Sequence, residues 1–155
     1  MIFDTEEEEI ISSIDVILIQ KALLNIISNS IKFTEPGGKI DVLIELEEEN
    51  IKIKVTDNGI GIEKEHLENI FAKFYQISPA LTRSSEGGGI GLYIVREIVE
   101  LHNGKIDFVS EFNVGSTMTI TLPKMHEEDT GINYVDDMLN ISEIARIEMA
   151  DLIHY

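Results

Sequence analysis

Two pairs of alternating apolar and polar runs are the feature that most restricts how this chain folds. The first pair covers residues 39–46 and 51–55, and the second covers residues 105–110 and 116–122. A period of two is typical of strands with one buried face, and the short turn within each pair indicates an antiparallel hairpin. The order of one helix, two strands, further helices and two strands predicts an α+β fold. We expect a two-layer sandwich whose mixed, mainly antiparallel sheet carries helices on one face.

Helical periodicity precedes each predicted hairpin. Residues 14–33 repeat apolar side chains at spacings of three, four and seven, which predicts a packed helix with the stripe Ile17, Leu24, Ile27 and Ile31. A short helix is expected over about residues 63–74. A longer one is expected over residues 90–101, where His102-Asn103-Gly104 is a stop signal.

Composition excludes several classes of function. The 155 residues include 12 Lys and Arg against 29 Asp and Glu, a formal net charge of −17, and such an anionic surface disfavours nucleic-acid and membrane-surface binding. There is no cysteine, which removes disulfides, thiolate nucleophiles and cysteine metal ligands. With 43% apolar residues, the chain can bury a core of ordinary size.

The two ends of the sequence bear on location and domain organisation. The first residues lack the basic and apolar regions of a signal peptide, and no apolar run approaches the roughly 18 residues that a membrane span needs. We therefore expect a cytoplasmic protein, or the cytoplasmic part of a membrane-bound one, with no direct membrane contact. The length favours one domain, residues 1–124, followed by a tail of different composition over residues 125–155.

Three local patterns carry polar chemistry. Asn25, Asn29 and Lys32 share one face of the first helix, and it is not the apolar face. Amide oxygens suit Mg²⁺ and an ammonium group suits phosphate, although a solvated helix face is the commoner explanation of such a pattern.

Asp57 ends a strand before a glycine-rich turn, so its carboxylate could accept a hydrogen bond from an exocyclic amine such as that of adenine. A plain Asp-Asn-Gly turn fits Asp57 equally well.

A glycine cluster precedes the second long helix. Residues 87–91 run directly into that helix, whose free N–H groups and positive dipole end could face phosphates. The Gly-Lys-Ser/Thr ending of a Walker loop is absent. The cluster does not open a βαβ unit, so the dinucleotide-binding fingerprint is disfavoured as well.

Four sequence blocks, taken together and in order, identify a protein family far more specifically than any one of them does alone. Residues 24–34, 57–62, 70–76 and 87–92 resemble the N box, first glycine box, F box and second glycine box of the ATP-binding catalytic domain of sensor histidine kinases. The resemblance covers about residues 10–124. It implies a Bergerat-type ATP-binding fold, shared with gyrase, the mismatch-repair ATPases and a heat-shock chaperone family, with ATP and Mg²⁺ as cofactors.

The resemblance also implies a role for each matching residue. Asn29 would coordinate Mg²⁺ with support from Asn25, and Lys32 would contact a phosphate. Asp57 would accept the adenine amine, helped by Gly61 and Thr117 through the backbone and a bound water, while Phe33 packs near the base or ribose. The complete set implied to bind ATP is Asn25, Asn29, Lys32, Phe33, Asp57, Gly59, Gly61, Ile62, Phe74, Arg83, Gly87, Gly89, Ile90, Gly91, Leu92 and Thr117, with Asn29 as the metal ligand.

A lid over the nucleotide is implied across about residues 76–89. Arg83 would be the cation that approaches the phosphates, and the hinge and phosphate-facing turn would come from Gly87, Gly89 and Gly91. Phe71 and Phe74 would anchor the lid, although plain packing in the core fits these two phenylalanines nearly as well.

The residue at position 25 distinguishes between reactions of this fold. The ATP-hydrolysing relatives resemble one another in having a glutamate there as general base, and an asparagine has no useful basicity. The sequence therefore favours transfer of the γ-phosphoryl group to a protein side chain. His126-Glu127 resembles a phosphoacceptor motif, but Gly131 breaks the helix it would need, so no acceptor histidine is expected in this chain.

We therefore expect an enzyme that is incomplete alone: the catalytic domain of a two-component sensor histidine kinase, over residues 1–124. It would supply the γ-phosphoryl group of ATP to a histidine on a separate dimerisation domain of the parent kinase, with a response regulator as an indirect partner. Two alternatives stay open. One is a degenerate module that senses nucleotide or docks a partner, and the other is a serine kinase or ATPase of the same fold.

Overall fold

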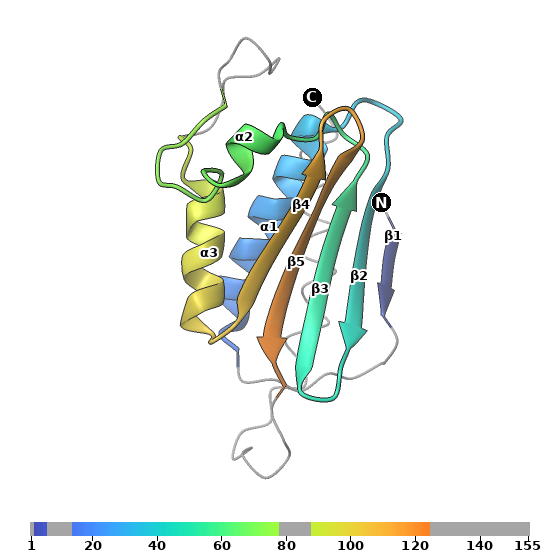
Figure 1. The fold of residues 1–155 in the computed structure, drawn as a ribbon. Coiled ribbons are helices and arrows are strands. Elements are labelled where there is room, and N and C mark those ends of the chain that lie inside the picture. The colour runs from blue at the N-terminus through green and yellow to red at the C-terminus, as the bar shows by residue number, and fades with distance from the viewer. Residues whose placement is uncertain (1, 6–13, 78–87, 125–155) are drawn as a thin grey trace.

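The computed structural model describes residues 2–5, 14–77 and 88–124 of the chain. Within these ranges the elements are β1 (Ile2–Thr5), α1 (Val16–Phe33), β2 (Ile40–Leu46), β3 (Asn50–Asp57), α2 (Lys64–Leu67), α3 (Gly91–Leu101), β4 (Lys105–Glu111) and β5 (Gly115–Pro123). Figure 1 shows α1 and α3 side by side on one face of the sheet. The predicted α+β two-layer architecture is confirmed.

The five strands form one sheet in the order β1-β2-β3-β5-β4. Pairing is antiparallel from β2 to β4, and β1 adds a parallel edge in which Ile2 lies opposite Asp41. The two predicted hairpins are therefore present, and they lie next to each other through the pairing of β3 with β5. The sequence did not predict β1, because four residues are too few to show an alternating pattern.

The core lies between the sheet and the two long helices. The buried strand residues are Val42, Ile51, Ile53, Val55, Met118, Ile120 and Leu122, and the helices contribute Ile19, Ala22, Leu23, Ile26, Ile27, Val95, Ile98 and Val99. The stripe predicted for α1 was only partly right, because Ile27 is buried whereas Ile17 is 75% exposed. Apolar residues occur on nearly every side of this helix, so periodicity alone did not single out the buried face.

Helix α1 also corrects the expectation about apolar runs. Val16–Phe33 reaches 18 residues with a mean hydropathy of 1.3, which by length and composition alone is enough to cross a membrane. In the fold it packs Ile19, Ala22 and Ile26 into the core between the sheet and α3. We therefore interpret α1 as the core helix of this domain.

The short helix α2 is shorter than predicted. It covers only Lys64–Leu67, and hydrogen-bonded turns continue the chain toward Tyr75, whose N–H donates to the carbonyl of Ala72 over 3.2 Å. Phe74 has a φ of 65°, a left-handed conformation that an α-helix cannot include. The predicted extension to Phe74 was therefore wrong.

Helices α1 and α3 are joined at one end through His102. The N–H of Asp15, the residue that caps α1, donates to Nε2 of His102 over 2.9 Å. On the other side of the ring, Nδ1 of His102 lies 2.7 Å from the carbonyl oxygen of Ile98 in α3. This contact ties the beginning of α1 to the end of α3, and α3 ends at Leu101 as predicted.

Candidate functional site

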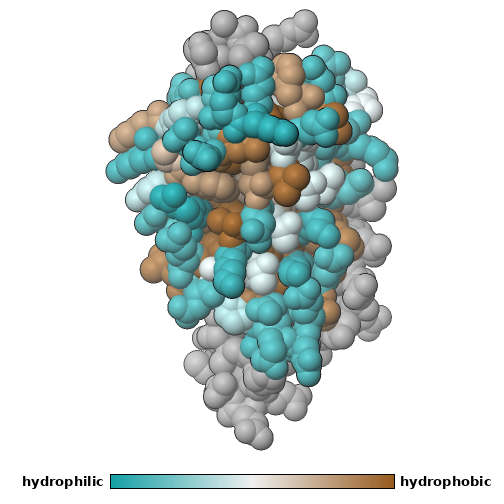
Figure 2. Space-filling view, in the orientation of Figure 1, coloured by the Kyte–Doolittle hydropathy of each residue, from teal (hydrophilic) through white to brown (hydrophobic). Residues whose placement is uncertain are grey.

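A cavity of about 500 Å³ lies among the second half of α1, the end of β3, the region around α2, the beginning of α3 and the turn between β4 and β5. This volume is in the usual range for a small-molecule site. Figure 2 shows apolar side chains reaching the surface between hydrophilic ones in this part of the molecule. Predicted site residues that line the cavity are Asn25, Asn29, Lys32, Phe33, Asp57, Gly61, Ile62, Gly89, Ile90, Gly91 and Leu92.

Asp57 is held in place at one end of the cavity by three donors. Its Oδ2 accepts a hydrogen bond from the hydroxyl of Ser30 over 3.0 Å. Its Oδ1 accepts from the N–H of Gly59 over 3.0 Å and from the N–H of Ser116 over 3.3 Å. Hydrogen bonds of this kind fix the direction of a carboxylate before a ligand arrives. Asp57 is therefore a preoriented acceptor at the end of β3.

Ser30 is a site residue that sequence reasoning missed. It is only 6% exposed, and among the described residues it is the one buried polar side chain. Its signal in the sequence was a polar residue one turn after Ile26 on the buried stripe of α1. A buried hydroxyl needs a partner, and the partner here is the carboxylate of Asp57.

Replacing Ser30 with alanine should let the Asp57 carboxylate change orientation while leaving the cavity volume almost unchanged. We expect Ser30→Ala to lower the free energy of unfolding by about 2 kcal/mol and to weaken binding of a ligand that donates to Asp57 about fivefold, because a net hydrogen bond to a charged acceptor is lost. Urea denaturation and calorimetric titration measure the two effects. Thr119→Ala, on the opposite sheet face, is the control, and equal affinities for Ser30→Ala and the unmodified protein would contradict this role of Ser30.

The first glycine turn is shaped by its contacts with two other segments. A Cβ on Gly59 would collide with the carbonyl oxygen of Phe33, and one on Gly61 with the carbonyl oxygen of Glu111. Gly61 also has a φ of 63°, which favours glycine. The N–H of Ile60 donates to the carbonyl of Phe33 over 3.0 Å, so the turn is fixed to the end of α1. Close backbone packing therefore requires these glycines, independently of any ligand.

The predicted polar face of α1 lines the cavity. Asn25, Asn29 and Lys32 all line it, which disfavours the alternative of a merely solvated helix face. Asn25 donates through Nδ2 to the carbonyl of Lys21 over 2.8 Å, and its Oδ1 lies against Gly91. Two amides and an ammonium group thus line the same cavity as Gly91, which begins α3 and whose first-turn N–H groups have no partner within the helix. This is a donor set that suits phosphate and Mg²⁺.

The second glycine turn packs on the segment after α2. Gly89 has a φ of 65°, and a Cβ there would lie 2.7 Å from the carbonyl oxygen of Tyr75. The N–H of Phe74 donates to the carbonyl of Gly89 over 2.8 Å. The turn that begins α3 is therefore positioned by the backbone of Phe74 and Tyr75.

The side chain of Thr117 lies on the face of the sheet away from the cavity. Its hydroxyl lies 3.1 Å from that of Thr56, and it does not line the cavity. The strand alternates, so Ser116 and Met118 face the cavity and Thr117 faces the other side of the sheet. Ser116 is the residue whose N–H lies beside Asp57, and the backbone role of Thr117 stays a prediction.

Phe74 also departs from the prediction. It is 65% exposed and does not line the cavity, so it is neither a core aromatic nor a wall of the site. Phe71 does pack, edge to face against Phe108 with ring centroids 6.4 Å apart. Gly59 acts through its N–H to Asp57 and is not a lining residue. Arg83 and Gly87 lie outside the described residues.

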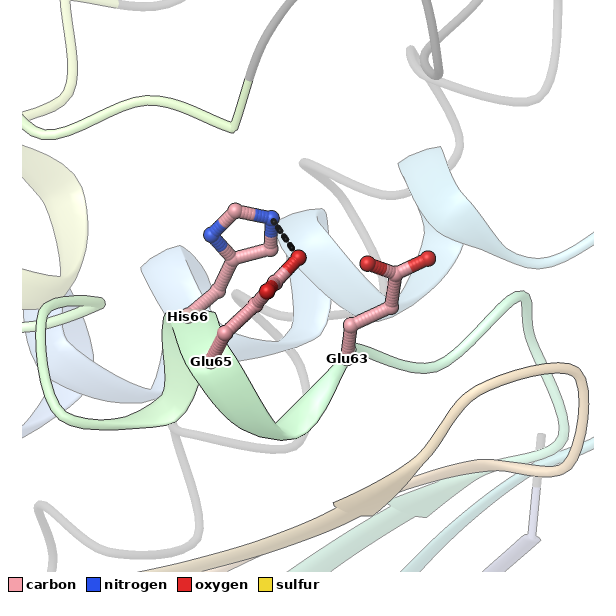
Figure 3. A group of neighbouring side chains, drawn as sticks. All are labelled: Glu63, Glu65 and His66. Atoms are coloured by element: carbon pink, nitrogen blue, oxygen red, sulfur yellow. Dashed lines mark ion pairs between the residues drawn. The ribbon is translucent and has the colours of Figure 1, made fainter.

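A group of three ionisable residues at α2 was not predicted as part of the site. Glu63, Glu65 and His66 have ligand-type atoms within 4.8 Å of one another, and Figure 3 shows His66 beside Glu65. The two facing atoms, Nε2 of His66 and Oε1 of Glu65, are 3.9 Å apart. His66 lines the cavity together with Glu63. Its involvement depends on long-range packing that no local motif records.

Comparison with known proteins gives the family. The model for histidine kinase-, DNA gyrase B-, and HSP90-like ATPases matches residues 14–126. The chain belongs to this family of ATPases. The matched range covers all the elements described above except β1, and it includes every cavity residue named here.

The relatives narrow the assignment within the family. The sensor protein SrrB of Staphylococcus aureus is 38% identical over 112 residues, which are 72% of this chain and 19% of SrrB, so the chain spans about a fifth of that relative. The solved catalytic domain of the histidine kinase ThkA is 30% identical with a TM-score of 0.68, and the match covers 79% of this chain and 78% of that one. The mycobacterial sensor histidine kinase MprB matches at 26% identity and a TM-score of 0.63, over 79% and 82% of the two chains. The chain therefore contains the ATP-binding catalytic domain of a sensor histidine kinase.

Proposed function

We propose that this domain binds Mg²⁺-ATP in the cavity and supplies the γ-phosphoryl group to a histidine on a separate dimerisation and phosphoacceptor domain. A response regulator would receive the phosphoryl group afterwards, and the domain would act on the cytoplasmic side. The observation that carries the proposal is the set of polar groups that line one cavity. A preoriented carboxylate, Asp57, lines it together with Asn25, Asn29 and Lys32 of α1 and the beginning of α3.

Two groups of cavity residues each suit one part of the nucleotide. Asp57 can accept a hydrogen bond from the adenine amine while Ser30, Gly59 and Ser116 hold it in direction. Asn29 offers an amide oxygen to Mg²⁺, and Lys32 offers positive charge to phosphate oxygens. Bound Mg²⁺ would neutralise charge on the phosphates during transfer. Positioning and charge neutralisation are most of what phosphoryl transfer requires of a protein.

The amide at position 25 supports transfer rather than hydrolysis. A general base for water would need a group that can take a proton, and the Asn25 amide cannot do so. Its Nδ2 is already committed to the carbonyl of Lys21, and its Oδ1 lies against Gly91. We therefore expect a slow hydrolysis of free ATP and a faster transfer when an acceptor domain is supplied.

Calorimetric titration with a non-hydrolysable ATP analogue, with and without Mg²⁺, tests nucleotide binding. We expect Asn29→Ala to weaken binding about tenfold in Mg²⁺ and little without it, because the amide oxygen is the proposed metal ligand. Asn69→Ala, an exposed amide outside the cavity, is the matched control. Failure of the folded, unmodified domain to bind would contradict the proposal and favour a degenerate module.

Transfer itself is tested with γ-labelled ATP and the phosphoacceptor domain of the parent kinase. Label on a histidine of that domain, appearing only when this domain is present, is the expected result. Rapid turnover of ATP to ADP without any acceptor would instead favour an ATPase.

A further inference from the structure

A hydrogen bond joins α2 to the chain segment just before the second glycine turn. Nδ1 of His66 lies 2.8 Å from the hydroxyl oxygen of Tyr75, and their rings are tilted with centroids 6.3 Å apart. The side chain of His66 is only 24% exposed, and both residues line the nucleotide cavity. We name this contact the His66–Tyr75 brace.

The brace is connected through the backbone to the second glycine turn and the beginning of α3. The carbonyl of Tyr75 lies against Gly89, and the N–H of Phe74 donates to the carbonyl of Gly89 over 2.8 Å. Two residues later, Gly91 begins α3 and lies against the amide oxygen of Asn25. A shift of Tyr75 would therefore move the backbone that presents the first N–H groups of α3.

The bond is compatible with the charges around His66. A neutral ring can accept the Tyr75 proton at Nδ1, and a ring protonated at Nδ1 can donate to the Tyr75 oxygen. The facing groups are Glu65, whose Oε1 is 3.9 Å from Nε2, and Glu63, which belongs to the same close group. Both acidic side chains lie on the Nε2 side of the group in Figure 3 and leave the contact at Nδ1 to Tyr75.

We propose that His66 is a positioning residue for the phosphates of the nucleotide. It acts through Tyr75, which holds the second glycine turn so that the N–H groups of α3 and the face of Asn25 meet the same phosphate chain. The proposal rests on the proposed function of the cavity. It predicts that loss of the brace weakens binding of the phosphates while leaving recognition of the base by Asp57 intact.

The test compares an ATP analogue with adenosine, which lacks the phosphates. We expect His66→Ala and Tyr75→Phe each to weaken the non-hydrolysable ATP analogue about tenfold in Mg²⁺ and to change adenosine affinity less than about twofold, with NMR titration measuring both ligands. His66→Asn keeps a hydrogen-bonding atom near the place of Nδ1 and should restore affinity to within about threefold of the unmodified domain. The double variant should be no weaker than either single variant, because both remove one bond.

Two matched variants control for general effects. Tyr93→Phe removes a hydroxyl from α3 outside the cavity lining, and Glu65→Gln removes the exposed charge beside His66. Neither should change affinity for the ATP analogue. Tyr75→Phe deletes a single oxygen, so it keeps the test decisive if His66→Ala fails to fold.

Three results would overturn the proposal. Unchanged affinity for the ATP analogue in Tyr75→Phe would show that the brace does not position the groups that bind the phosphates. Equal weakening of adenosine and of the ATP analogue would show a general structural role. Failure of the unmodified, folded domain to bind either ligand would overturn the proposed function and this inference together, whereas the first two results leave the proposed function standing.

Discussion

Replacing Asp57 with asparagine should raise the dissociation constant for ATP at least a hundredfold, beyond detection at millimolar nucleotide. The carboxylate accepts from three donors, and it is the proposed acceptor for the adenine amine. An asparagine has one oxygen instead of two, and its NH₂ group would face a donor where an acceptor is needed. When a polar group in such a site is left without a hydrogen-bond partner, the binding affinity falls by several powers of ten.

Calorimetric titration of Asp57→Asn against the unmodified domain measures this effect. Asp107→Asn makes the same chemical change on the exposed side of β4 and should leave affinity unchanged. A circular dichroism spectrum separates loss of binding from loss of folding. If a folded Asp57→Asn variant bound ATP within tenfold of the original affinity, Asp57 would not be the residue that reads the base.

Replacing Gly61 with alanine should destabilise the domain by about 3 kcal/mol or more. The new Cβ would collide with the backbone of Glu111, and the φ of 63° would add the cost of a left-handed conformation. Neither the β4–β5 turn nor the first glycine turn can move away easily. The N–H of Asn113 donates to the carbonyl of Ile60 over 2.7 Å and holds the two turns together.

Gly37→Ala provides the comparison for this prediction. Gly37 has a φ of 88° but no atom within 4 Å of an added Cβ, so only the conformational cost of about 1 kcal/mol applies. Urea denaturation gives the free energy of unfolding for both variants. If Gly61→Ala lowered the free energy of unfolding no more than Gly37→Ala, the backbone of the two turns would move apart more easily than the structure indicates.

Much of the fold was predictable because its signals are local. The alternation in residues 39–46 and 116–122 requires one buried face, and the structure buries Val42, Ile120 and Leu122 there. The site was predictable to the same extent. Helix geometry placed Asn25 and Asn29 on one face of α1, and the resemblance of the four ordered blocks to the kinase family indicated that this face and Asp57 belong to one site.

The remaining features depend on contacts between distant segments. Ser30 acquires its role only when β3 brings Asp57 to within hydrogen-bonding distance, and His66 only when the chain returns with Tyr75. Ser116 was missed because its contact with Asp57 depends on the pairing of β3 with β5. Local periodicity contains no information on such pairings.

The cavity is assembled from segments that are far apart in the sequence, and this ties the binding site to the cooperativity of folding. Its walls meet through single backbone contacts, from Ile60 to Phe33, from Asn113 to Ile60 and from Phe74 to Gly89. Because the cavity needs all of these segments together, the site forms and unfolds with the whole domain. A bound nucleotide therefore stabilises the entire domain against unfolding, by about 2.7 kcal/mol when its free concentration is a hundred times the dissociation constant.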